Sequence, residues 1–567
     1  MQEDICWKGT FPSRFKMIFC TFSMLLFIAP VSYAADNVAF FSSINLLLTS
    51  NETCSVLGDD TSDPKYDISY EGLNYYQPDM SYRNYGLSQL SDKDFNRLST
   101  MDRRKVADKL LASLFFGYTA NVLKQKIASG SFLCSVRQGL SQQKNNMTVV
   151  EEEIRNEDRY HHGTWAVNEI YDIMARFYAM EHLDNHYLNN WMAYILTQTI
   201  LFSPAYELDS AHYPNVASVY NWLVMDMNED IGMRYSTYMH MASSDNWRRF
   251  RSPEDNGREM LEIYTLDLND ANVPKAAKAL QNWYLDDDYD TLVIGLNQNT
   301  IPQSLFNTTV TTGFDFYREL VKSGGFISGS VRRLVDFFFT DHDEIKKTQI
   351  TNLIVASNPE TWQDVLLQIV FSREFLLHTS RAKSAEELFY SLVKKLDYKH
   401  YKYTFYYFVE SLEDMNQASM KYKLGKLERT PLDSLSFSYY HKYIRERILG
   451  QNVCGAVEEG GYEDWNNDGW RPGLLGDDRF TYTMDDPEAT VRSFVTYLFE
   501  FMIHRTPTSQ ELKMFTDNML RDNGDYKWSY NFSVVYGGCY DRRENAAEDI
   551  LDYISRLSEL YMFQEVQ

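Results

Sequence analysis

The stretch STMDRRKVADKLLASLF, residues 99–115, decides the fold. Ser99 or Thr100 can cap the start of a helix, because their hydroxyl oxygens accept hydrogen bonds from free backbone N–H groups. The apolar residues that follow recur at steps of three and four positions: Val106, Leu110, Leu111, Leu114 and Phe115. This spacing is that of an α-helix with a buried apolar face. The stretch therefore predicts a helix that packs inside a larger helical body.

The helical pattern continues outward from this stretch. Helices are predicted over residues 164–182, 187–203, 216–242, 254–266, 273–284, 313–323, 328–340, 344–357, 360–378, 384–397, 436–449, 488–504, 508–520 and 543–562. A loop with β-prone and turn residues interrupts them at residues 292–312. Because no regular strand alternation appears, the predicted fold class is all-α. We expect a large multi-helix body with an irregular N-terminal extension and a loop-rich C-terminal segment.

Composition divides the chain into four expected parts. Residues 1–34 form a signal peptide, and residues 35–98 an irregular extension rich in Asp, Ser, Asn and Tyr. Residues 99–450 form the helical core domain, and residues 451–567 a loop-rich segment followed by C-terminal helices.

The N-terminus predicts export. Positively charged residues come first: Lys8, Arg14 and Lys16. An apolar run over residues 17–31 and small residues before Ala35 complete the pattern of a secretory signal. An uncleaved anchor is the alternative, but the run is shorter than the roughly 20 residues that span a bilayer. No later stretch is long and apolar enough to cross a membrane. We therefore expect a periplasmic, outer-membrane-associated or secreted protein.

The net charge limits the classes of partner that we expect, and the cysteine content bears on the redox compartment. The net charge of −24 argues against nucleic acid and anionic lipid surfaces as partners. The 41 Tyr residues suit carbohydrate or protein contact surfaces, although an AT-rich genome explains them equally well. Four cysteines follow the signal, and an even number permits two disulfides in an oxidising compartment. Of three possible pairings we favour Cys54–Cys134 and Cys454–Cys539, because each closes a loop within one end of the chain.

Three blocks of the chain resemble a known family. They are PEDNGREMLEIYTL with the helix that follows it (residues 253–283), FSREF with RAKSAEEL (residues 371–388), and LGQ with the later Gly-Tyr and Trp (residues 449–470). These blocks are similar to the bacterial domain-of-unknown-function family 1800. The resemblance implies an exported, helical protein and brings no established reaction. The chain departs from the family at Gly257, Tyr264 and Asp267, where the family has Ala, His and Gly.

The first block also contains a pair of carboxylates. Glu259 and Glu262 are three positions apart, so they lie on one helix face, as a metal site or an acid/base pair requires. The alternative is structural: Arg258 forms an ion pair with Glu262, and acidic residues near the N-terminus favour the helix dipole. His182 and His186, four positions apart, are a further possible metal pair, with helix-end histidines as the alternative.

A possible calcium loop lies in the third block. Asp464, Asn466 and Asp468 supply oxygens at alternate positions, and Gly469 follows them. The twelfth position is Leu475, where a calcium loop has a bidentate Glu. Calcium is thus the one cofactor that the sequence suggests, and a plain turn rich in Asp and Asn is the alternative.

Three functions fit these features. The leading hypothesis is an exported, non-enzymatic helical scaffold or accessory subunit of a bacterial cell-envelope assembly, for example in secretion or surface machinery. It rests on the missing nucleophile elbow and phosphate-binding loop. The first alternative is a carboxylate-dependent hydrolase or lyase that acts on envelope polysaccharide through Glu259 and Glu262. The second is a calcium-stabilised binding module. We expect other envelope proteins as partners, and glycan as a further possible ligand.

Overall fold

The structure is a computed structural model that divides the chain into two compact units. Unit 1 comprises Met1–Gly86, Met192–Leu334 and Thr351–Val365, and unit 2 comprises Leu87–Trp191, Val335–Ile350 and Leu366–Gln567. The residues that the structure describes are 69–70, 73–74, 85–119, 127, 130–142, 177, 180, 182–201, 216–286, 291–396, 434–449, 480–481, 486–520 and 542–566.

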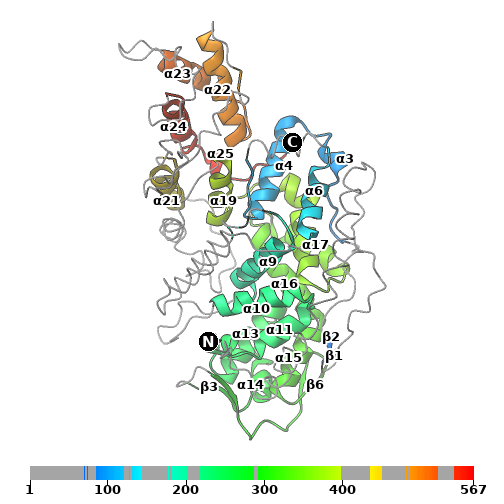
Figure 1. The fold of residues 1–567 in the computed structure, drawn as a ribbon. Coiled ribbons are helices and arrows are strands. Elements are labelled where there is room, and N and C mark those ends of the chain that lie inside the picture. The colour runs from blue at the N-terminus through cyan, green and yellow to red at the C-terminus, as the bar shows by residue number, and fades with distance from the viewer. Residues whose placement is uncertain are drawn as a thin grey trace, which may run out of the picture. The chain divides into compact units, whose positions relative to one another are not determined.

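Unit 1 combines helices with short hairpins (Figure 1). Its elements are β1 (Ser69–Tyr70), β2 (Leu73–Asn74), α10 (Val216–Asn228), α11 (Met233–Met241), α12 (Ser244–Arg249), α13 (Pro253–Thr265), α14 (Val273–Ala279), β3 (Trp283–Asp286), β4 (Thr291–Ile294), β5 (Gln303–Leu305), β6 (Thr308–Val310) and α15 (Gly313–Lys322). The strands pair antiparallel as β1–β2, β3–β4 and β5–β6, with Trp283 opposite Ile294 and Gln303 opposite Val310.

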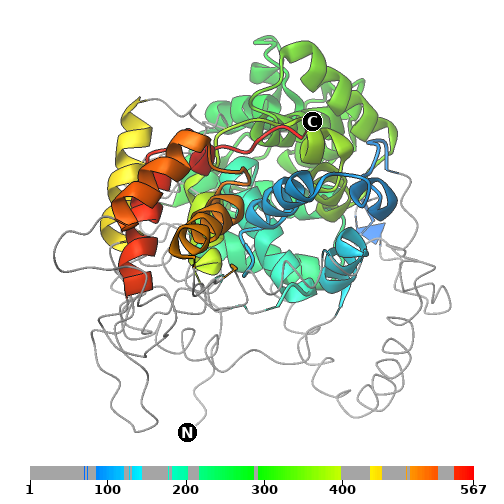
Figure 2. The same cartoon turned by 90° about the horizontal axis from the view of Figure 1, so that it is seen from above.

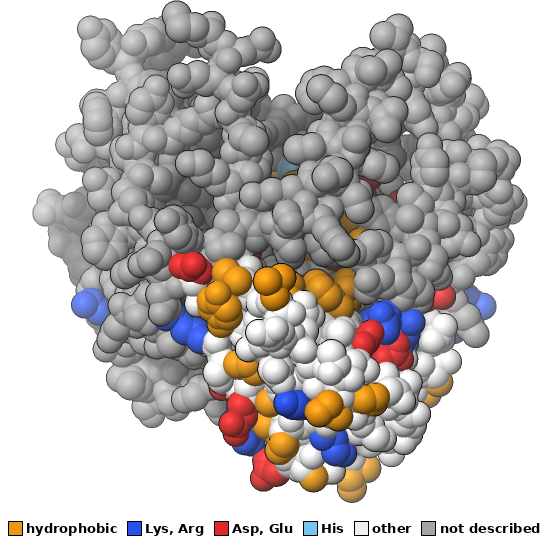
Figure 3. Space-filling model, turned by 90° about the horizontal axis from the view of Figure 1, so that it is seen from below, with side chains coloured by type: hydrophobic (Ala, Val, Ile, Leu, Met, Phe, Trp, Pro, Cys, Tyr) orange, Lys and Arg blue, Asp and Glu red, His pale blue; other side chains and the backbone are white. Residues whose placement is uncertain are grey.

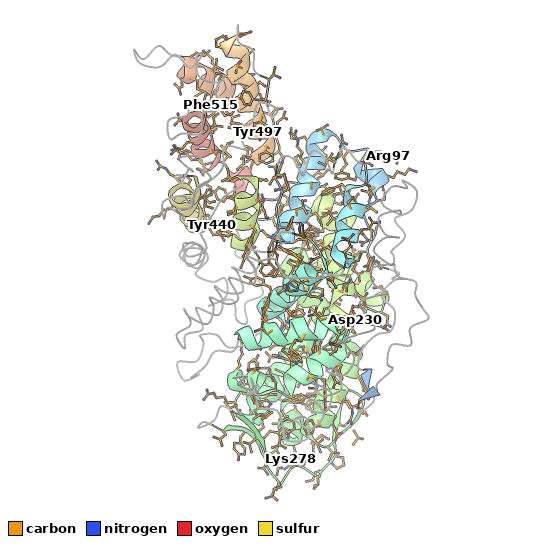
Figure 4. All side chains as sticks on the ribbon, viewed as in Figure 1. Arg97, Asp230, Lys278, Tyr440, Tyr497 and Phe515 are labelled. Carbon is orange, nitrogen blue, oxygen red and sulfur yellow. The ribbon has the colours of Figure 1, made fainter. Side chains whose placement is uncertain are left out.

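Helices make up the regular secondary structure of unit 2 in its described residues, and two isolated β-bridges join Gln89 to Ser372 and Ala382 to Met562. Its elements are α3 (Asp92–Phe95), α4 (Thr100–Ser113), α6 (Phe132–Ser141), the π-helix η1 (Glu374–His378), α19 (Ala385–Lys395), α21 (Ser434–Tyr443), the π-helix η2 (Ile444–Leu449), α22 (Pro487–Met502), α23 (Ser509–Leu520), α24 (Arg542–Ile554) and α25 (Ser558–Tyr561). Helices α22 and α23 lie side by side in Figure 1 and Figure 2. Tyr497 of α22 and Phe515 of α23 mark this pair in Figure 4.

Four further helices contain the boundaries between the units. They are α9 (Asn185–Thr199), α16 (Gly324–Phe338), α17 (Glu344–Ala356) and α18 (Trp362–Val370).

Helix α4 confirms the helix predicted from residues 99–115. The Ser99 side chain accepts a hydrogen bond from the Asp102 backbone N–H, so Ser99 is the cap. The predicted apolar positions are at most 3% exposed. Asp108 and Lys109 are buried as well, so the second half of the helix is enclosed on all sides. The spacing of apolar residues alone predicted one buried face.

Helices α13 and α14 pack closely because of one glycine. Ser252 caps α13, Pro253 occupies its first turn, and Leu266 ends it in the left-handed conformation. A Cβ atom at Gly257 would lie 2.9 Å from the Ala276 Cβ of α14. The absence of a side chain at Gly257 therefore permits this close approach.

The all-α class is confirmed, and several elements differ locally from the prediction. Residues 216–242 form two helices, α10 and α11, because the chain turns at Asp230, whose φ is 53°. The expected loop at residues 292–312 holds the second strand of one hairpin and both strands of another. These strands of three or four residues are too short to show a regular alternation.

Exposed apolar side chains of unit 1 lie near charged ones. Figure 3 shows hydrophobic side chains interspersed with charged ones on one face of the molecule. The large hydrophobic residues that are more than half exposed in unit 1 are Leu268, Leu296 and Ile301. Lys278 of α14 is also exposed and is labelled in Figure 4.

Among the described helices, none has both the length and the apolar character that a bilayer span needs.

Candidate functional site: a buried charge cluster in unit 2

The predicted carboxylates lie on α13 of unit 1. Glu259 and Glu262 are both half-buried. Arg258 forms its ion pair with Asp270, in the loop after the helix, at 2.9 Å. The direct partner of Arg258 is therefore Asp270, and the charge of Glu262 acts on the guanidinium as a smaller effect.

The electrostatics of this pair are those of neighbouring acids. Burial raises the pKa of Glu259, and the negative charge of Glu262 raises it further. Tyr264 is buried beside Phe326, with ring centroids 6.2 Å apart. Its side chain thus belongs to the apolar interior of unit 1.

The other predicted sites lie partly outside the described residues. The calcium candidates lie outside the described residues: Asp464, Asn466 and Asp468. Of the paired cysteines only Cys134, on α6, is among the described residues, so both disulfides stay predictions. His182 is exposed, and the carbonyl of His186 accepts a hydrogen bond from Asn190. In the part of the chain that the structure describes, no group of three or more His, Cys, Asp or Glu side chains is placed to hold a metal ion.

Four titratable side chains meet inside unit 2. We call Asp108, Lys383, Lys395 and His504 the charge cluster. Lys383 Nζ lies 2.9 Å from one carboxylate oxygen of Asp108, and Lys395 Nζ lies 2.6 Å from the other. His504 Nε2 is 3.5 Å from Asp108 Oδ2 and 3.3 Å from Lys395 Nζ. Ser391 also donates to the carboxylate at 3.2 Å.

Four positions of the chain bring these side chains together. Asp108 lies in α4, Lys383 just before α19, and Lys395 in the last turn of α19. His504 follows the end of α22 and has a φ of 56°, a left-handed conformation that usually favours glycine at a helix end. The cluster therefore joins helices that are far apart in the sequence.

Two buried lysines also complete the ends of helical segments. Lys395 Nζ donates to the carbonyl of Met502, the last residue of α22, at 3.2 Å. Lys109 Nζ donates to the carbonyl of Thr379, just after η1, at 2.6 Å. Carbonyl groups at helix ends lack partners within their own helix, so each ammonium group supplies a needed donor.

The pKa values follow from burial and from the pairing. Burial favours a neutral Asp108, but Lys383 and Lys395 outweigh it and hold the pKa of this carboxyl well below its usual range. Burial lowers the pKa of Lys395 to about 8. Burial, with the charge of Lys395, lowers the pKa of His504 to about 4. At neutral pH the imidazole is thus neutral and the Asp108 carboxylate is charged.

A second buried ion pair lies beside the cluster. Arg381 NH1 and NH2 each donate to one Glu387 oxygen at 2.8 Å, and the two side chains are 1% and 0% exposed. Glu387 also accepts from the Ser384 backbone, which completes the capping box of α19. The Arg381 guanidinium lies 4.9 Å from the centre of the Phe563 ring. The backbone N–H of Phe563 donates to the Arg381 carbonyl, so the C-terminal segment pairs with this region.

A third group of charges lies nearer the surface of unit 2. His342 Nδ1 is 3.2 Å from Asp341 Oδ1, and its Nε2 is 2.9 Å from Glu374 Oε1. Lys346 binds the other Glu374 oxygen at 2.9 Å. Because both ring nitrogens face carboxylates, the imidazole is held between two partners and has no free nitrogen to act as a base.

The charge cluster is suited to holding structure together. Its side chains are 1–5% exposed, so a substrate cannot reach them without opening the unit. A general base or nucleophile must come within hydrogen-bond reach of its substrate. The arrangement therefore favours a structural role for these groups over a catalytic one.

The sequence contains weak signals of the charge cluster. Asp108 and Lys109 interrupt an otherwise apolar helix face. Arg381, Lys383 and Glu387 all lie within the short segment RAKSAEEL. His504 carries no local signal, because its role depends on contacts with distant helices.

Comparison with known proteins adds no assignment. The chain matches no family model, no curated protein and no solved structure. The resemblance to family 1800 therefore rests on the quoted residues alone and stays a prediction.

Proposed function

We propose that the protein is an exported, non-enzymatic helical scaffold or accessory subunit of a bacterial cell-envelope assembly. One observation carries the proposal. The charge cluster and the Arg381–Glu387 pair place acids and bases inside unit 2, where they bind each other across distant segments. Buried ion pairs between distant segments favour one fixed arrangement of those segments. A scaffold needs such a fixed shape.

The proposed location comes from the sequence. The basic residues, apolar run and small residues of the first 34 positions support export. The net charge of −24 supports a partner with basic surfaces and opposes nucleic acid. Cysteine pairs at the two ends of the chain, if oxidised, would stabilise such a protein outside the cytoplasm.

Cross-linking in intact cells, followed by purification of the envelope complex, tests the scaffold proposal. We expect the chain in one complex of fixed stoichiometry, recovered in equal amount from the wild type and from Glu259→Gln/Glu262→Gln. We expect Glu387→Gln to reduce the recovered complex, because it weakens the buried pair that shapes unit 2. A chain that stays monomeric in envelope extracts contradicts the proposal.

A second candidate function has one observation in its favour. Glu259 has a raised pKa beside Glu262, and an acid/base pair of carboxylates needs one group that holds its proton longer than the other. Both side chains are half-buried, so solvent and ligands can reach them. This supports a carboxylate-dependent hydrolase or lyase that acts on envelope polysaccharide.

Turnover of purified envelope polysaccharide tests this candidate. Glu259→Gln and Glu262→Gln should each lower the rate at least about 100-fold if the carboxylates act as acid and base. Glu254→Gln is the matched control, since Glu254 is an exposed acid in the first turn of the same helix. Unchanged rates in the first two variants, or no turnover by the wild type, rule the hydrolase out.

A further inference from the structure

Two segments of unit 2 share one sequence pattern and one geometry. RAKSAEEL, residues 381–388, and RTPTSQEL, residues 505–512, both read Arg-x-x-Ser/Thr-x-x-Glu-Leu. In both segments the two terminal nitrogens of the Arg donate to the two carboxylate oxygens of the Glu, at 2.8 Å in the first and at 2.8 and 2.9 Å in the second. We call these segments the first clasp and the second clasp.

The agreement between the clasps extends beyond the ion pair. The Glu of each clasp accepts from the backbone N–H of the Ser or Thr, and its own N–H donates to that hydroxyl at 3.2 Å. Six positions before each Arg lies a phenylalanine, Phe375 or Phe499, whose ring centre is 5.8 or 5.1 Å from the guanidinium. Each clasp therefore joins two helical segments in the same way: η1 to α19, and α22 to α23.

Residues 559–566, which we call the strap, contact both clasps. At the first clasp the strap is paired through its backbone. The Phe563 N–H donates to the Arg381 carbonyl, and the Lys383 N–H donates to the Tyr561 carbonyl, both at 2.8 Å. Phe563 is 2% exposed, and its ring centre lies 4.9 Å from the Arg381 guanidinium. The strap thus covers the ion pair of the first clasp.

Side chains of the strap reach the second clasp. Glu559 Oε1 accepts from Arg505 Nε at 3.0 Å, on the side of the guanidinium that its partner in the clasp leaves free. Gln564 Nε2 donates to the Ile503 carbonyl, just before the second clasp, at 3.0 Å. Gln564 directly follows Phe563, so adjacent residues of the strap hold the two clasps. A displacement of the strap therefore removes contacts from both clasps at once.

We propose that the strap is a conformational device that couples the two clasps, so that the starts of α19 and α23 open together when the strap is released. Local opening in proteins occurs in cooperative units whose parts share contacts, and the strap supplies contacts that the two clasps share. The alternative is that each clasp is stabilised by its own ion pair and opens by itself.

Hydrogen exchange of the full chain, read by mass spectrometry for peptides of α19, α23 and α6, tests the coupling. Phe563→Ala removes the strap side chain that lies on the first clasp. We expect exchange to become faster by at least about tenfold at the starts of both α19 and α23. Exchange in α6, a helix of the same unit that packs on α3, should change by less than about twofold.

A second variant acts from the other clasp. Glu559→Gln removes the ion pair between the strap and Arg505, and we expect faster exchange in α23 and also in α19. Asp517→Asn is the matched control, because it breaks the exposed ion pair of Asp517 with Lys513 on α23 and should leave α19 unchanged.

Two outcomes of the exchange experiment overturn the proposal. A rise in α19 alone in Phe563→Ala shows that each clasp opens by itself. A rise of equal size in α6 shows that Phe563 supports the whole unit and not a coupling of the clasps. If Phe563→Ala does not fold, Glu559→Gln decides: faster exchange in α19 supports the coupling, and unchanged exchange there refutes it.

Discussion

Around Tyr317 in unit 1, buried polar groups form a neutral chain. Trp247 Nε1 donates to the Tyr317 hydroxyl at 3.0 Å, which donates to Asn256 Oδ1 at 2.7 Å. Around Asp108 in unit 2, the buried polar groups are charged, and two ammonium groups share one carboxylate. Both interiors contain large aromatic side chains, so the difference lies in the polar groups they enclose.

The two regions depend on their hydrogen-bond and ion-pair partners to different degrees. A neutral group that loses its partner costs the desolvation of one dipole, about 1–3 kcal/mol. A buried charge that loses its partner costs more, about 3–5 kcal/mol, because the remaining charge is left without compensation. The same kind of substitution should therefore be more damaging around Asp108 than around Tyr317.

The largest expected effect is that of Glu387→Gln in unit 2. The variant keeps the size of the side chain but leaves the buried Arg381 guanidinium without a carboxylate. We expect a loss of about 3–5 kcal/mol in the free energy of unfolding. Guanidinium unfolding followed by circular dichroism measures this change.

Glu488→Gln provides the control for this variant. Glu488 pairs with Arg492 on α22 of the same unit, but both side chains are about half exposed, at 54% and 46%. Solvent screens such a pair, so the loss should stay below about 1 kcal/mol. Equal losses in the two variants would show that burial does not set the cost of breaking these pairs.

The next effect is that of Tyr317→Phe in unit 1. Removing the hydroxyl leaves Trp247 Nε1 without its acceptor and Asn256 Oδ1 without its donor. We expect a loss of about 1–3 kcal/mol in the free energy of unfolding. Tyr284→Phe is the control, because the Tyr284 side chain is 49% exposed on β3 and should leave the value unchanged. A loss in Tyr317→Phe larger than that in Glu387→Gln would reverse the comparison.

The sequence predicted what depends on local spacing. Residues 99–115 indicated the helix and its apolar core positions, because a helix places every third or fourth residue on one face. The carboxylates of α13 were likewise found from their spacing. The hairpins β3–β4 and β5–β6 were missed as strands, since three or four residues are too few to show a period of two.

The charge cluster could not be predicted, for a physical reason. Lys383 and Asp108 are 275 positions apart, and Lys395 and His504 are 109 positions apart. No local pattern reports which distant helix will cover a charged side chain. A lysine on a helix usually faces solvent, so Lys109 and Lys395 were not expected in the interior. Only the packing of α4 and α19 in three dimensions reveals the cluster.

A smaller effect is expected for Gly257→Ala, which tests the packing of α13 on α14. The new Cβ atom would lie 2.9 Å from Ala276 Cβ and 3.2 Å from the Ala277 nitrogen. The crowding should outweigh the gain in helix propensity and cost about 1 kcal/mol. Gly324→Ala in α16 is the control, because a Cβ there meets no atom within 4 Å, and it should be neutral or stabilising. Chemical denaturation measures both, and a stabilised Gly257→Ala would show that the helices can move apart at little cost.

The smallest effect concerns His342, which holds an ion pair of unit 2 nearer the surface than the charge cluster. Burial opposes its charge, but Asp341 and Glu374 outweigh burial and raise its pKa above 6.5. The same imidazolium helps to lower the pKa of both carboxyls, so they stay ionised near neutral pH. A group whose pKa is higher in the folded than in the unfolded state makes its full contribution to the free energy of unfolding at pH values below its unfolded pKa. That contribution is lost as the pH rises through the folded pKa.

We therefore expect wild type to exceed His342→Gln in unfolding free energy at about pH 5.5, with a difference that shrinks towards about pH 8.5. Denaturation of both proteins across this range measures the difference, and a gap that stays constant or widens contradicts the assignment. Lys346, which binds Glu374 at either pH, leaves part of the network intact, so this loss should be smaller than that of Glu387→Gln.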